Sequence, residues 1–141
     1  MKKLLLVALA ALLISAPAAA EVTAGIVAPY LHIQLALAND STDGVADAAK
    51  AVATAAGKLG DAGRSIAAAA QAVAGAADLK TVRATFGPLS DALIDYGQEV
   101  GFGDFKVAYC PMVGKSWVQK DGDILNPFYG STMLNCGDFT Q

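Results

Sequence analysis

The sequence predicts a mainly α fold, an antiparallel bundle of about four helices carrying a small C-terminal cap of irregular structure and a β-hairpin. Three observations predict it. From residue 21 to about residue 101, alanine is abundant and runs of β-branched residues are absent. Apolar residues in this region recur every three or four positions, the spacing of one helix face. After Gly101, glycine, aspartate and aromatic residues replace alanine, which is typical of turns and short strands.

The first helix is expected from about Thr23 to Ala38. Its apolar stripe has members three or four positions apart: Ile26, Tyr30, Ile33 and Leu37. Residues 39–43 are polar, so they should end this helix and offer side chains that cap the next one. The second helix is expected from about Thr42 to Leu59, where Gly60 closes it.

The third helix is expected from about Ala62 to Ala76, with Asp61 as its cap. The strongest periodicity follows, from Leu79 to Val100, and predicts one long helix. Pro88 lies inside it and removes a backbone hydrogen bond. A kink near Phe86, or a division into two shorter helices, is therefore expected.

Two short strands are expected in the cap, at residues 105–109 and 116–120. Asp121-Gly122 is a tight-turn signal, which predicts a hairpin between residues 117–120 and 123–125. Asn126-Pro127 then begins another turn, which Gly130 ends.

Residues 1–20 have the features of a signal peptide. Lys2 and Lys3 precede an apolar run over residues 4–14, and small residues at Ala18 and Ala20 fit a cleavage site. The run is shorter than the roughly 20 residues that a spanning helix needs. We therefore expect an exported protein with a periplasmic location and no membrane segment after cleavage. Residues 21–141 are expected to form a single domain, with the cap at residues 102–141.

The charge of the chain is mildly acidic. The formal net charge is -3, from 10 basic and 13 acidic residues. Loss of Lys2 and Lys3 leaves 8 basic residues against those 13, a net charge of -5. Nucleic acids and anionic lipids are bound by clustered lysine and arginine, so no nucleic-acid partner is expected.

Sulfur is concentrated in the cap, where each of two short segments holds one cysteine and one methionine. These residues are Cys110, Met112, Met133 and Cys136. Cys110 and Cys136 could form a disulfide, as is common in exported domains, with the methionines filling gaps in the core. Alternatively, the four residues could form a metal site, because thiolates and thioethers select Cu(I) or Ag(I). The residues alone leave both interpretations open.

The aromatic residues of the same region are expected to form the core of the cap: Tyr109, Trp117, Phe128 and Tyr129. The single histidine, His32, is expected to be a partly exposed helix residue. The chain contains no CxxC, HExxH, G-x-S-x-G or phosphate-loop motif. We therefore expect no enzymatic activity.

Several motifs resemble the signature of a family. They are Tyr109 to Met112, Trp117, Asn126 to Gly130 and Met133 to Gly137, together with Phe86 to Ser90 and Leu37 to Asp40 in the helical part. The pattern resembles a bacterial exported domain of unknown function, which occurs alone or at the end of periplasmic adaptor subunits of copper and silver efflux pumps. The resemblance implies an accessory role in heavy-metal handling, with an efflux adaptor as the partner and Cu(I) or Ag(I) as the metal.

Overall fold

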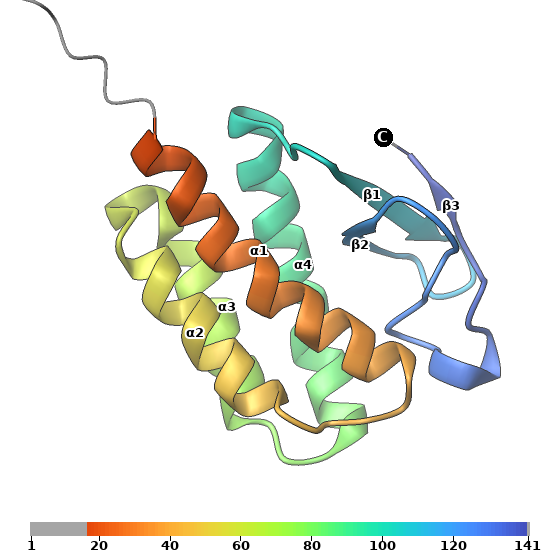
Figure 1. The fold of residues 1–141 in the computed structure, drawn as a ribbon. Helices are drawn as coiled ribbons and strands as arrows, with labels where there is room; N and C mark the ends of the chain where they lie inside the picture. The colour runs from red at the N-terminus through yellow and green to blue at the C-terminus, as the bar shows by residue number, and fades with distance from the viewer. Residues whose placement is uncertain (1–16, 141) are drawn as a thin grey trace, which may run out of the picture.

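The structure is a computed structural model that describes residues 17–140, with side chains described from Thr23 onward. It confirms a helical bundle with a small β cap (Figure 1). Residues 1–16 of the predicted signal peptide lie outside the described residues. Four α-helices form the bundle: α1 (Pro17–Ala38), α2 (Val45–Gly57), α3 (Arg64–Gly75) and α4 (Leu79–Val100).

The loops before α2 and α3 differ from the predicted caps. Gly44, with φ 70°, precedes α2, and no side chain caps that helix. The hydroxyl of Ser41 instead accepts a hydrogen bond from the Asp43 N–H within the loop. Before α3, a 3₁₀ turn, η1 (Gly60–Gly63), replaces the predicted first residues, and Asp61 pairs with Arg64. The capping predictions for residues 39–43 and for Asp61 are therefore wrong.

The predicted fourth helix is confirmed as a single element. α4 is continuous from Leu79 to Val100 although Pro88 lies inside it. Its first residue is capped by Asp78, whose side chain accepts a hydrogen bond from the Thr81 N–H at 2.9 Å. This N-cap satisfies one of the backbone donors that a helix leaves free at its start.

One continuous core joins the bundle to the cap, which here means residues 102–140. The sheet lies on the side of the bundle formed by α1 and α4, away from α2 and α3 (Figure 1). Tyr30 of α1 stacks on Phe86 of α4, with ring centroids 5.0 Å apart. Trp117 from the cap is fully buried in the same cluster. Burial of these large aromatic side chains compensates for the small area that each alanine contributes.

The cap contains a three-stranded sheet in the order β2-β1-β3, formed by β1 (Phe105–Cys110), β2 (Lys115–Lys120) and β3 (Asp138–Phe139). Both pairs are antiparallel. The two predicted strands are thus present, but they pair with each other, with Val107 opposite Val118. The hairpin predicted between residues 117–120 and 123–125 is wrong.

A buried side chain explains why residues 123–125 do not continue the sheet. The Gln119 amide nitrogen donates to the Asp123 carbonyl at 2.8 Å, and its oxygen accepts from the Leu125 N–H at 3.1 Å. The backbone groups that a strand would use are therefore already bonded to a side chain.

Within residues 17–140, no helix is both long enough and apolar enough to cross a membrane.

Candidate functional site

The two cysteines of the cap are brought together by the sheet. Cys110 ends β1, and Cys136 lies just before β3, which pairs with β1. They form a disulfide, with Cα atoms 5.7 Å apart and a separation of 26 positions in the sequence. Cys110 is fully buried. In this state neither sulfur is a thiolate, so neither is available as a strong ligand for a soft metal ion.

The two methionines lie on the surface of the cap and do not fill the core. Met112 is in the turn between β1 and β2 and is 65% exposed, while Met133 follows the 3₁₀ turn η2 (Gly130–Thr132) and is 36% exposed. The expectation that they fill core gaps in a disulfide-bonded cap is wrong, because both side chains are exposed.

The remaining metal-ligating side chains do not converge. Among residues 17–140, no group of three or more histidine, cysteine, aspartate or glutamate side chains is placed to hold a metal ion. His32 is exposed, and its Nε2 lies 3.0 Å from the Asp43 carbonyl oxygen, where it braces the loop before α2. The prediction that the four sulfur residues bind metal concerns the reduced protein and stays a prediction.

Three of the four aromatic residues expected in the cap core lie there. Trp117 is fully buried, and its ring packs against Phe128 in an edge-on arrangement with centroids 6.1 Å apart. Phe128 and Tyr129 are half-buried against the core. Tyr109 is 40% exposed, so its assignment to the core is wrong. The other residues at the end of β1, Val107, Ala108 and Cys110, are buried.

Asn126 organises the loop that carries the second sulfur segment. Its fully buried side chain accepts hydrogen bonds from the Phe128 and Tyr129 N–H groups at 2.8 and 3.1 Å. Its amide nitrogen donates to the Cys136 carbonyl at 2.9 Å. One side chain therefore fixes the predicted turn at residues 126–130 and also holds the disulfide segment beside it.

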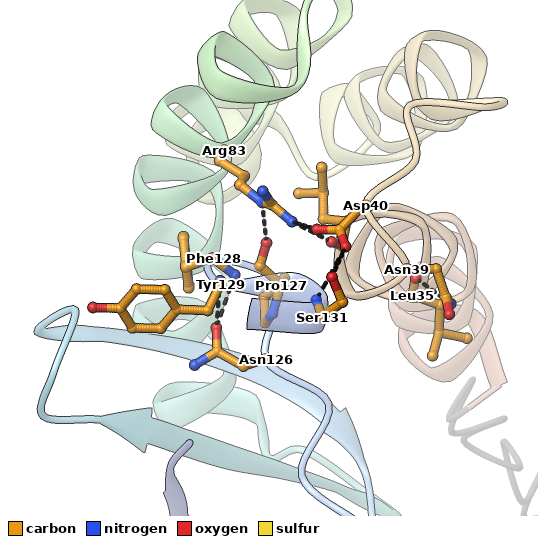
Figure 2. A network of polar contacts seen from close by, with 10 residues as sticks. Leu35, Asn39, Asp40, Arg83, Asn126, Pro127, Phe128, Tyr129 and Ser131 are labelled. Atoms are coloured by element: carbon orange, nitrogen blue, oxygen red, sulfur yellow. Dashed lines mark hydrogen bonds and ion pairs between the residues drawn. The ribbon is translucent and has the colours of Figure 1, made fainter. Parts of the chain in front are cut away.

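A polar network attaches this loop to the bundle (Figure 2). Arg83 of α4 donates to the Asp40 carboxylate at 2.7 Å, to the Leu37 carbonyl at 2.7 Å and to the Pro127 carbonyl at 2.9 Å. The other Asp40 oxygen accepts hydrogen bonds from the N–H and hydroxyl of Ser131. The end of α1, the second turn of α4 and the cap are thus joined at one point.

The electrostatics of this network favour the charged carboxylate. Hydrogen bonds from Ser131, and then from Arg83, lower the pKa of Asp40 from 3.8 to about 2. Asp40 has a left-handed backbone with φ 55°, which is uncommon outside glycine. The network holds the carboxylate in this position, where it faces both partners.

A second buried connection lies deeper in the interface. The Tyr30 hydroxyl is 2.7 Å from the Ser90 hydroxyl and accepts a hydrogen bond from the Val118 N–H at 3.1 Å. Burial raises the pKa of Tyr30, so the phenol stays neutral and keeps its proton to donate. This contact satisfies a backbone donor at the outer edge of β2.

Sequence reasoning missed Arg83 as a functional residue. Arg83 directly follows Val82 on the buried stripe of α4, and a charged residue at the border of such a stripe usually needs a partner. That position is the one feature of the sequence that indicates a partner for Arg83. Its partners Asp40 and Pro127 are more than 40 residues away along the chain, so no local pattern points to them.

Comparison with known families identifies the family of this chain. The family described as "Protein of unknown function (DUF3347)" matches residues 26–104, more than half of the sequence. The chain belongs to this family. The matched region covers most of α1, the other helices and the approach to β1, and ends before the sulfur-bearing segments. No curated protein and no solved structure matches the chain.

Proposed function

We propose that this DUF3347 protein is a non-catalytic accessory protein of copper and silver handling in the periplasm, and that it works by contacting a protein partner. The Cys110–Cys136 disulfide carries this proposal, because it converts the two strongest metal ligands of the cap into a covalent brace. The sequence features of export and the resemblance to efflux-adaptor domains supply the compartment and the process.

The state of the polar side chains supports a role without a buried ligand. In the part of the chain that the structure describes, every buried side-chain nitrogen and oxygen has a hydrogen-bond partner. Ligand and catalytic sites commonly leave polar groups directed at the missing molecule. The buried polar side chains of the cap and its interface are instead bonded within the protein: Ser90, Asn126, Gln34 and Gln119.

Deletion of the gene tests the proposal. The deletion strain should tolerate less copper and silver than its parent, and the native gene should restore growth. Complementation with Met112→Leu and Met133→Leu together should restore it equally, because protein contact does not require thioether ligands. Unchanged tolerance after deletion overturns the link to heavy metals.

A second candidate function is direct hand-over of Cu(I) or Ag(I), favoured by the exposed thioethers of Met112 and Met133. An external dithiol would supply two electrons and two protons to the Cys110–Cys136 bond and leave as a disulfide. The chain would then offer two thiols and two thioethers, a soft donor set. Anaerobic Cu(I) titration of the reduced protein tests this function. Stoichiometric binding should be weakened by Cys110→Ser and by Met133→Leu, and unchanged binding in both variants would contradict it.

A further inference from the structure

α1 is apolar on two opposite faces, of which one is fully buried in the core and the other is only partly covered. The inward stripe is Ile26, Tyr30, Ile33 and Leu37, all fully buried. A second stripe has members four, three and four positions apart: Ala24, Ala28, Leu31 and Leu35. A helix that is apolar all round is normally covered all round. Here Leu31 is buried, but Ala24 and Ala28 are exposed and Leu35 is 42% exposed.

This second stripe forms one wall of a continuous groove. A cavity of about 470 Å³ lies between it and the cap residues Phe105 and Lys120. A cavity of about 440 Å³ extends it past Val27 towards Val100 and Asp104. At the other end, a cavity of about 270 Å³ continues from Leu31 and Leu35 towards Asp123. Because neighbouring cavities share lining residues, they form a single surface that runs along α1.

The dimensions and hydrogen bonding of the groove fit a helix. From Ala24 to Leu35, α1 extends about 17 Å at 1.5 Å per residue, which corresponds to about three helical turns of a partner. An added β-strand would need free backbone groups at the edge of β2. The Val118 N–H at that edge is already bonded to the Tyr30 hydroxyl. An amphipathic helix binds through its side chains and needs no such backbone groups.

The charges along the groove define the partner further. Asp104 lies at one end and Asp123 at the other, and within residues 23–140 neither carboxylate has an ion-pair partner. Lys120 lines the middle of the groove. A complementary helix would carry basic residues at both ends and an acidic residue near its centre.

We propose that this groove, lined by the Ala24–Leu35 stripe of α1 and by Phe105 and Lys120 of the cap, binds an amphipathic helix of a partner protein with that charge pattern. The proposal rests on the proposed interaction function and names the surface that performs it. The partner helix would place leucine-sized side chains three or four positions apart against Ala24, Ala28 and Leu35.

Fluorescence anisotropy with two labelled peptides tests the groove in the mature, disulfide-bonded protein. Both peptides are helical, about 15 residues long, with leucine at every third or fourth position. One has lysine at both ends and glutamate at the centre; the other has these charges exchanged. At low salt the first should bind about tenfold more tightly. Equal affinities would overturn the proposal.

Protein variants give the matched controls. Leu35→Glu should abolish binding of the lysine-ended peptide, while Ala72→Glu, an exposed position on α3, should leave it unchanged. The double change Asp104→Lys and Asp123→Lys should reverse the preference between the peptides. Unchanged binding of the lysine-ended peptide by Leu35→Glu would contradict binding in the groove. The gene deletion decides the proposed function separately, since a tolerance defect without peptide binding would place the interaction on another surface.

Discussion

Asp40 and Arg83 join the end of α1 to the second turn of α4 through a contact of 2.7 Å, and the same carboxylate accepts hydrogen bonds from Ser131 of the cap. The contact therefore connects three parts of the chain that are distant in sequence. It also explains why two motifs of the sequence, Leu37 to Asp40 and Asn126 to Gly130, lie against each other: both end at this network.

Asp40→Asn should reduce the acid sensitivity of folding. The pKa of Asp40 is lowered from 3.8 to about 2 in the folded protein, so its charge stabilises the fold fully above about pH 4. That stabilisation is lost as the pH falls towards about 2. The free energy of unfolding, measured with urea from pH 7 to pH 2, should fall less steeply for Asp40→Asn in this window.

Part of the acid dependence should remain in that variant, because the pKa of Asp78 is also lowered, by hydrogen bonds from Thr81. Asp78→Asn is therefore the matched comparison. Superimposable pH profiles for the native protein and Asp40→Asn would show that the network does not hold the carboxylate as described.

Gly130→Ala should destabilise the protein more than Gly103→Ala. Both glycines have a left-handed backbone, with φ 57° and 59°. Each substitution should therefore cost about 1–2 kcal/mol from backbone strain. A Cβ at Gly130 would also collide with the Asp40 carboxylate and the Arg83 guanidinium, whereas a Cβ at Gly103 meets open space. Urea unfolding of the two variants measures the difference, and equal losses would contradict the close approach of loop and bundle.

Tyr30→Phe should lower the free energy of unfolding by about 1–3 kcal/mol. The change leaves the buried Ser90 hydroxyl and the Val118 N–H without their partner. Tyr30→Phe combined with Ser90→Ala should cost less than the sum of the single changes, because the second change removes one of the orphaned groups. Strict additivity in a double-mutant cycle would show that the two hydroxyls do not interact.

Reduction of the disulfide should destabilise the protein without abolishing the bundle. The bridge closes a loop between positions 26 apart, which is worth roughly 3–4 kcal/mol in the chain-entropy model. Urea unfolding with and without a reductant measures this loss. The double variant Cys110→Ala and Cys136→Ala should match the reduced protein in helix content by circular dichroism. Unfolding of the helices on reduction would contradict a core centred on Tyr30 and Phe86.

The sequence predicted the parts of this fold that depend on local spacing. The three-and-four periodicity from Leu79 to Val100 corresponds to α4, and the β-favouring residues at 105–109 and 116–120 correspond to β1 and β2. The strand pairing was wrong because the turn at residues 111–114, not Asp121-Gly122, closes the hairpin. Gln119 then bonds residues 123 and 125, a competition between side chain and strand that no alternation pattern reveals.

The sequence predicted which residues take part in the candidate site better than it predicted how they are arranged. The concentration of sulfur in two short segments indicated that Cys110 and Cys136 could meet, and they do. The outward position of Met112 and Met133 depends on how two turns are oriented, which residue types do not determine. Arg83 and Asp40 come together only after α1, α4 and the cap have packed, so their contact follows from tertiary structure alone.

Competitive titration of the disulfide-bonded protein with Cu(I) and a chromophoric chelator tests most directly whether the cap has a structural and protein-binding role without binding metal. Intact mass first verifies that the protein is 2 Da lighter than its reduced form, as expected for the loss of two hydrogens. We predict that the chelator then retains all of the Cu(I). One equivalent of Cu(I) held by the bridged protein, and lost on changing Met112 and Met133 to leucine, would contradict the account.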